Sequence, residues 1–119
     1  MSVYDLPTTD ALLSTTRSVR KRLDFDRPIP KEIILRCLEL SQQAPTGSNR
    51  QGWRWVVVAD PARRAAIAEV YRKGAGTYLE ESQRQAEASG AAQDARVFES
   101  AKYLAANIQK APVHVIPCI

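Results

Sequence analysis

Apolar and polar positions along the first third of the chain predict two helices separated by a loop. Residues 8–16 begin with good N-cap types and continue with two leucines, which predicts a short helix. Residues 24–30 predict a loop, because their two prolines lack N–H donors and force extended neighbours. In residues 30–44 apolar side chains recur three and four positions apart, which predicts a helix with one buried face.

After the second helix the pattern changes to a loop, a strand and a third helix. Residues 45–52 are rich in turn formers and small polar types, which predicts a loop. Residues 53–59 carry aromatic and β-branched side chains on both faces, so we expect a central strand covered on both sides. Residues 60–74 open with an Asp-Pro pair, which is typical of a helix start, and Gly74 and Gly76 predict the helix end.

The last third of the chain predicts a helix and a second strand. Residues 77–93 are polar and alanine-rich with little periodicity, so we expect a mobile surface excursion that is helical in part. Residues 94–112 carry a strong apolar stripe, which predicts a helix that Pro112 stops. Residues 113–119 predict another buried strand. Neither a repeat nor a linker divides the chain, so we expect residues 1–119 to form a single domain.

The two predicted strands are too few to make a stable sheet. A strand buried on both faces needs neighbours at its edges, and a two-stranded sheet is only marginally stable alone. Either a partner chain completes the sheet or the sequence is the front part of a longer protein. We expect the second, with the chain truncated at its C-terminus.

Composition agrees with one soluble domain and favours anionic ligands. The chain has 119 residues, of which 45% are hydrophobic and 25% charged, and its formal net charge is +4. Such a mild positive charge is weak evidence for a nucleic-acid partner. The sequence has neither the about 18 consecutive apolar residues of a membrane span nor a secretory signal pattern. We therefore expect a cytoplasmic protein without a membrane partner.

The cysteines and the histidine give little indication of catalysis. Cys37 and Cys118 lie far apart and lack CxxC spacing, so we expect two reduced thiols, one on a helix and one on a strand. His114 stands within a predicted strand, where we expect it to be packed. The sequence offers no Ser-His-Asp arrangement and no set of metal ligands, so we assign no catalytic side chain.

A cluster of basic residues follows the first predicted helix. Arg17 and Arg20 are three positions apart, with Ser18 between them. A tight turn would aim both guanidinium groups at one point, where their forked donors bind phosphate bidentately. The alternative is a solvated basic surface after a helix C-terminus, where arginine also favours the helix dipole.

A polar loop between the second helix and the first strand is the other candidate site. Residues 44–53 include Gly47, which permits close backbone approach, and Trp53, which could form a wall. Carboxamides donate and accept hydrogen bonds at once, which suits the edge of a heterocycle or a polyol chain. The alternative is a plain turn. The polar side chains belong to Thr46, Ser48, Asn49 and Gln51.

Together, these two stretches resemble a known family. The segment "TTRSVRKR", followed about thirty residues later by "APTGSNRQGWRWVVV", resembles the nitroreductase family of flavin-dependent oxidoreductases in order, spacing and residue types. The resemblance is strong over residues 15–58 and looser to the end of the chain. It implies an α+β fold of three α/β/α layers, of which this chain would be the N-terminal half, with two core strands and about four helices.

The resemblance also implies roles for individual residues in binding FMN. Thr46 stands where serine is common, Gly52 where proline is common, and Thr16 where many members have a further arginine. Because Thr16 replaces this arginine, the resemblance implies that one contact to the FMN phosphate is weaker or supplied elsewhere. In that family the basic element holds the phosphate and ribityl end, which here corresponds to Arg17, Ser18 and Arg20. The loop lies along the flavin, which here corresponds to Pro45, Thr46, Asn49 and Gln51.

The activity implied by the resemblance is that of an FMN-dependent NAD(P)H oxidoreductase. Members oxidise NAD(P)H in a ping-pong cycle and reduce small-molecule acceptors such as nitroaromatics and quinones. They are interlocked homodimers with two FMN sites at the interface, and they are longer than this chain. The isolated chain could therefore be inactive.

A small basic nucleic-acid-binding module is the competing class, and an inactive fragment is a third. Arginines and lysines spread along the chain could track phosphates, but such a platform needs exposed aromatic side chains among them. Trp53 and Trp55 begin an apolar strand, and we expect them to pack instead.

Overall fold

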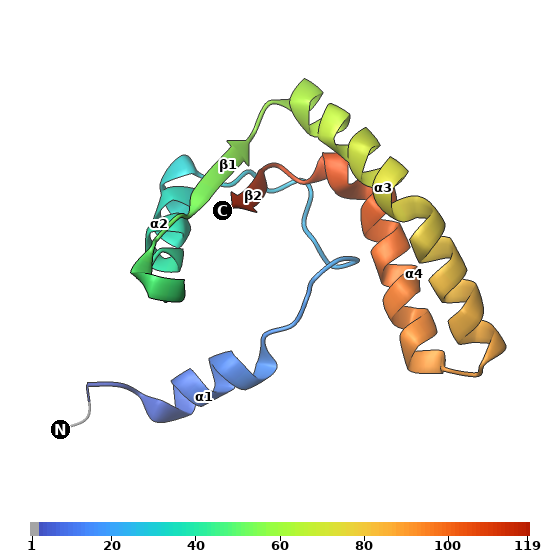
Figure 1. Cartoon of the computed structure of the whole chain (residues 1–119), viewed down its shortest axis with the longest axis horizontal. Coiled ribbons are helices and arrows are strands. Elements are labelled where there is room, and N and C mark those ends of the chain that lie inside the picture. The colour runs from blue at the N-terminus through green and yellow to red at the C-terminus, as the bar shows by residue number, and fades with distance from the viewer. Residues whose placement is uncertain (1–2) are drawn as a thin grey trace.

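The computed structural model describes residues 3–119 and shows a helix-rich chain with one small sheet (Figure 1). This arrangement agrees with the predicted α+β class. Short 3-10 turns occupy Gly47–Asn49 and Ile108–Lys110. The other elements are α1 (Leu6–Thr15), α2 (Lys31–Ser41), β1 (Arg54–Val58), α3 (Pro61–Ala88), α4 (Ala92–Asn107) and β2 (His114–Cys118).

Strands β1 and β2 form an antiparallel pair. Their register runs from Arg54 opposite Cys118 to Val58 opposite His114. Val58 and His114 are buried at one end of this ladder, but Val56 remains 47% exposed and Ile116 36% exposed. The expectation of strands covered on both faces is therefore wrong for residues 3–119. Helices α3 and α4 pack mainly on each other, so much of the sheet surface stays open to solvent.

Helices α3 and α4 form a long antiparallel hairpin (Figure 1). Helix α3 continues through Gly74 and Gly76 to Ala88, so the predicted helix end at these glycines is wrong. Residues 77–88 are mostly good helix formers, and their packing on α4 outweighs the helix cost of about 1 kcal/mol per glycine. The predicted surface excursion, residues 77–93, is helical as far as residue 88, where it forms the end of α3, and its remainder forms the turn and the first residues of α4.

The hairpin turn explains where α3 ends. Gly90 adopts φ +72°, a left-handed conformation that glycine reaches without a Cβ clash. Its N–H donates to the carbonyl of Glu87 at 3.2 Å, and the N–H of Ala91 donates to the carbonyl of Ala86 at 2.9 Å. This pair of bonds is the Schellman pattern, which satisfies carbonyls left free at a helix C-terminus.

The core is small and lies mostly between the two hairpin helices. Ala68, Leu79 and Ala86 of α3 and Ala105 of α4 are buried there. Alanines at this interface let the helix backbones approach closely. Beside them, Tyr78 and Phe98 meet edge to face, with ring centroids 6.2 Å apart.

The remaining helices are largely exposed. Figure 1 shows α1 extending away from the hairpin. On α2, Ile34 and Leu38 are only half-buried and Ile33 is 54% exposed, so the predicted buried face of this helix is only partly covered. The radius of gyration is 17.7 Å, whereas a compact domain of this length has about 13.5 Å. The described chain is therefore open rather than fully packed.

The predicted positions of the histidine and the cysteines are confirmed. His114 is buried, and its Nε2 lies 2.7 Å from the carbonyl oxygen of Ile108. Cys37 on α2 and Cys118 on β2 are free and exposed. Among residues 3–119, no helix combines the length and the apolar character that crossing a bilayer requires.

Candidate functional site

The basic segment (residues 17–22) leaves the end of α1 and is attached to α4. Arg20 donates from Nη1 to Ser100 Oγ at 3.3 Å, and Lys21 donates from Nζ to Glu99 Oε1 at 2.6 Å. The Ser100 hydroxyl donates in turn to the carbonyl of Val97 at 2.8 Å. Two adjacent residues of the segment thus contact two adjacent residues of α4, which orients the segment on the hairpin.

The basic segment and Ser100 line a cavity of about 260 Å³. Arg17, Ser18 and Arg20, the predicted phosphate-binding residues, are therefore brought together at one place. Arg17 also donates from Nη1 to the carbonyls of Ser14, at 3.0 Å, and Thr16, at 2.8 Å. Part of its hydrogen-bonding capacity therefore satisfies the C-terminus of α1, as the alternative interpretation of the cluster expected.

The Glu99 carboxylate, which contacts the basic segment, is favoured in its charged form. The hydrogen bond from Lys21, followed by the positive charge of that side chain, lowers the pKa of Glu99 below its ordinary value. Both side chains of this ion pair are about half exposed, at 45% for Lys21 and 57% for Glu99. Ser100 and Glu99 escaped the sequence analysis because they lie about eighty residues from their partners, and no local pattern indicates such a contact.

The amide loop (residues 45–52) has an unusual backbone. Ser48, Asn49 and Gln51 have φ values of 54°, 51° and 49°, in the left-handed region that non-glycine residues rarely adopt. Such conformations cost about 1 kcal/mol or more each and cluster at functional sites. Two contacts hold them in place: the Gln51 N–H donates to Thr46 Oγ1 at 3.0 Å, and Gln51 Nε2 donates to Asn49 Oδ1 at 2.9 Å.

A second cavity, of about 450 Å³, adjoins the amide loop. Trp53 lines it, as expected, and stacks on Trp55 with ring centroids 6.4 Å apart. The indole N–H of Trp53 is buried and has no acceptor within residues 3–119. The sequence analysis missed Gln42 and Gln43, although they directly precede the loop. The complete lining is Gln42, Gln43, Gln51, Trp53 and Arg54.

The two candidate segments are apart in a single chain. Gln51 lines one cavity and the basic segment lines another. Figure 1 shows the amide loop at the C-terminal end of α2, on the opposite side of the view from α4, to which the basic segment is attached. The sequence analysis expected both segments at one ligand, but one chain, over residues 3–119, holds them at separate places.

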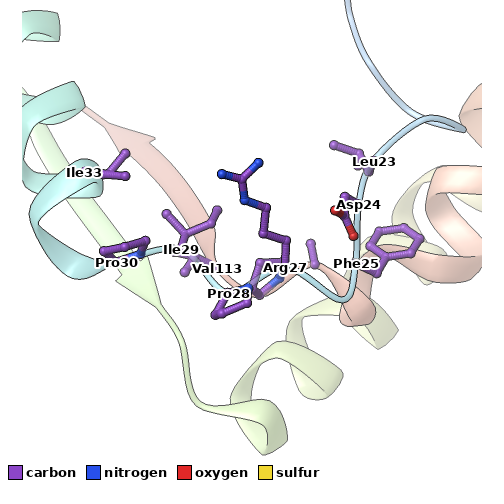
Figure 2. Close-up of a pocket in the computed structure, with 11 residues that line it drawn as sticks. Leu23, Asp24, Phe25, Arg27, Pro28, Ile29, Pro30, Ile33 and Val113 are labelled. Carbon is purple, nitrogen blue, oxygen red and sulfur yellow. The ribbon is translucent and has the colours of Figure 1, made fainter.

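A third cavity, of about 670 Å³, lies between the loop before α2 and the approach to β2. Figure 2 shows the Arg27 side chain standing between Ile29 and Asp24. Most of the lining is apolar, with Phe25, Pro30 and Val113 among its members. The sequence analysis assigned nothing here, because the cavity forms only where residues 23–33 meet residues 111–113.

Two of the arginines that could track phosphates in the nucleic-acid interpretation make hydrogen bonds within the protein. Arg64 donates to the carbonyls of Ala59 at 3.1 Å and Gln109 at 2.9 Å, and also to that of Ala111. Arg72 donates to the carbonyl of Ala105 and to the Gln109 side chain, each at 3.1 Å, and pairs with Glu69. With Trp53 and Trp55 stacked on each other as well, these contacts disfavour a phosphate-tracking surface.

Comparison with known proteins decides the family. The model of the nitroreductase family matches residues 13–117, which is most of the chain. The chain belongs to the nitroreductase family. The resemblance inferred from the basic cluster and the polar loop is thereby confirmed, and it extends beyond residues 15–58 into β2. Members of this family generally bind FMN and are dimeric.

Several curated nitroreductase-family relatives match parts of the chain. An NADH dehydrogenase of Thermus thermophilus is 40% identical over 67 residues, which are 54% of this chain and 31% of the relative. A 5,6-dimethylbenzimidazole synthase of Rhodospirillum rubrum is 38% identical over 79 residues, or 64% of this chain and 36% of the relative. Iodotyrosine deiodinase 1 of Rattus norvegicus is 36% identical over 59 residues, or 50% and 20%.

The matches cover only part of each relative. The chain spans between 20% and 36% of the length of these curated relatives. No solved structure matches the chain significantly.

Proposed function

We propose that the chain belongs to an FMN-dependent NAD(P)H oxidoreductase that reduces nitroaromatic or quinone-like acceptors in a ping-pong cycle. The observation that carries the proposal is the gathering of Arg17, Ser18 and Arg20 around one cavity in a chain of the nitroreductase family. The flavin, when bound, supplies the redox chemistry, and the chain binds and orients it.

The basic segment suits the phosphate end of the cofactor. A phosphate monoester carries about two negative charges near neutral pH. Guanidinium forks bind its oxygens bidentately, and charge-assisted bonds of this kind are stronger than neutral ones. Arg20 is half-buried and already oriented by Ser100, so little side-chain freedom is lost when it binds an anion.

The amide loop suits the edge of the flavin ring or its ribityl chain. The carboxamides of Asn49 and Gln51 are oriented by their mutual hydrogen bond, and Thr46 contributes a hydroxyl. Pro45 fixes the backbone at the start of the loop. The buried indole N–H of Trp53 is a further group that could donate a hydrogen bond to a heterocycle. The residues present thus fit a polar ring edge.

A homodimer provides a way for both segments to contact one cofactor. In one chain they line different cavities, so we infer that the basic segment of one chain and the amide loop of a second chain form each site. Members of the family are generally dimeric, which supports this arrangement. The complete three-layer fold, the whole activity and a cytoplasmic location belong to the same proposal, because the matched part is a fraction of the relatives' length.

Titration of the purified apoprotein with FMN and with riboflavin tests the proposal. We expect FMN to bind more tightly than riboflavin, since only FMN carries the phosphate that the basic segment binds. Arg20→Met should reduce this preference about tenfold, which corresponds to the loss of one charge-assisted contact of about 1.4 kcal/mol.

Arg84→Met is the matched control, because Arg84 is an exposed arginine on α3 and its loss changes the net charge equally. It should leave the preference unchanged. Equal binding of FMN and riboflavin by the wild-type protein, or binding of neither, would contradict the proposal. Oligonucleotide binding with steep salt dependence and no flavin affinity would favour the nucleic-acid module instead.

A further inference from the structure

The ion pair between Lys21 and Glu99 lies at the edge of the proposed phosphate site. Lys21 belongs to the lining of the cavity, together with Arg17, Ser18 and Arg20. Its ammonium group is engaged by the Glu99 carboxylate at 2.6 Å. Without a ligand, a carboxylate of the protein itself therefore neutralises one of the cations that face the cavity.

This pair can be exchanged at little cost. Both side chains are about half exposed, at 45% and 57%, and ion pairs in such positions contribute little net free energy. The lysine ammonium has three donors on a flexible stem, so it can turn from one anion to another. The neighbouring contact between Arg20 and Ser100 keeps the basic segment on α4 while Lys21 changes partner.

We propose that Glu99 is a displaceable counter-ion of this site, whose place on Lys21 is taken by the phosphate of a bound phosphate monoester. The inference rests on the phosphate part of the proposed function. Glu99 acts as an affinity-setting residue, because its negative charge both occupies Lys21 and repels the incoming anion.

The proposal predicts the sign of two substitutions. Glu99→Gln removes the competing charge, so phosphate binding should become about two- to fivefold tighter at low salt, and screening should diminish the gain at high salt. Ser100→Ala removes the acceptor that orients Arg20, so phosphate binding should weaken. If the ion pair only held the basic segment in place, both substitutions would weaken binding.

The test follows three probes by NMR titration of the full chain: inorganic phosphate, FMN and riboflavin. Glu39→Gln is the matched control, because Glu39 forms an exposed ion pair with Arg36 on α2 and the chemical change is the same. We expect Glu99→Gln to tighten binding of phosphate and FMN but not of riboflavin, and Glu39→Gln to change none of them.

The outcomes separate this inference from the flavin proposal. If Glu99→Gln tightens phosphate binding while FMN binds no better than inorganic phosphate, the counter-ion role stands and the flavin assignment fails. If the wild type binds FMN but Glu99→Gln leaves its affinity equal or lower, the counter-ion role is overturned and the flavin assignment stands. Binding of neither phosphate nor FMN by any variant overturns both.

Discussion

Replacement of Arg64 by methionine tests whether the basic residues of α3 hold the fold together. Arg64 reaches from the first turn of α3 to the carbonyls of Gln109 and Ala111, just before β2, and to that of Ala59 after β1. It therefore ties the start of the hairpin to both strands. Methionine retains an apolar stem of similar reach and removes the donors.

The expected loss in the free energy of unfolding follows from these contacts. The two bonds to Gln109 and Ala111 are part-buried. Each is worth about 1 kcal/mol, because partial exposure reduces it below the roughly 1.5–3 kcal/mol of a hydrogen bond to a charged group. The bond to Ala59 is exposed to solvent and adds little. We therefore expect Arg64→Met to destabilise the chain by about 2 kcal/mol.

Urea unfolding followed by circular dichroism measures this loss as a lower midpoint at unchanged slope. Arg63→Met is the control, because Arg63 is the exposed neighbour on the same helical turn, and surface substitutions usually change stability by less than about 0.5 kcal/mol. If the two variants unfold at the same midpoint, Arg64 does not tie the strands to the hairpin. If Arg64→Met lowered oligonucleotide binding with stability intact, the nucleic-acid interpretation would regain support.

Two further predictions concern the hairpin. Gly90→Ala should destabilise the chain by about 1 kcal/mol, because alanine is strained at φ +72°. Gly76→Ala, within α3, should instead stabilise the chain, because alanine favours the helix more than glycine does. Equal urea midpoints for the two variants would count against the Schellman assignment. The hydrogen bond from Arg72, followed by its positive charge, lowers the pKa of Glu69 in the folded chain below its ordinary value. The stabilisation of the fold by this ion pair is therefore fully present above the pKa of the unfolded chain, and it is lost as pH falls through the lower pKa of the folded chain. The difference in urea midpoint between the wild type and Glu69→Gln should therefore vanish in acid. A difference that persists in acid would show that it does not come from the ion pair between Glu69 and Arg72.

Local patterns predicted most of the secondary structure. The two strands are found within one residue of their predicted bounds, and the helices before and after the loop of residues 24–30 lie within three. The third helix was predicted too short because Gly74 and Gly76 were taken as its end. The glycine that does end it, Gly90, is recognisable only by its positive φ and the bonds that follow it.

The candidate site was predictable in residue type but not in arrangement. Arg17, Ser18 and Arg20 share a cavity, which their spacing indicated. Their attachment to Glu99 and Ser100 depends on how the hairpin packs, and no local pattern contains that information. The separation of the amide loop from the basic segment is likewise set by tertiary structure. Whether these residues bind FMN stays a prediction.

The asymmetry of the small sheet bears on how the chain behaves in solution. Within residues 3–119, β1 pairs only with β2, so each strand has an outer edge. Pro117 lacks an N–H and interrupts the donors of β2, whereas β1 has the uninterrupted sequence RWVVV. An outer strand of this kind is a template for pairing with another chain. Concentrated samples should therefore self-associate through β1, and Val56→Lys should keep them dispersed.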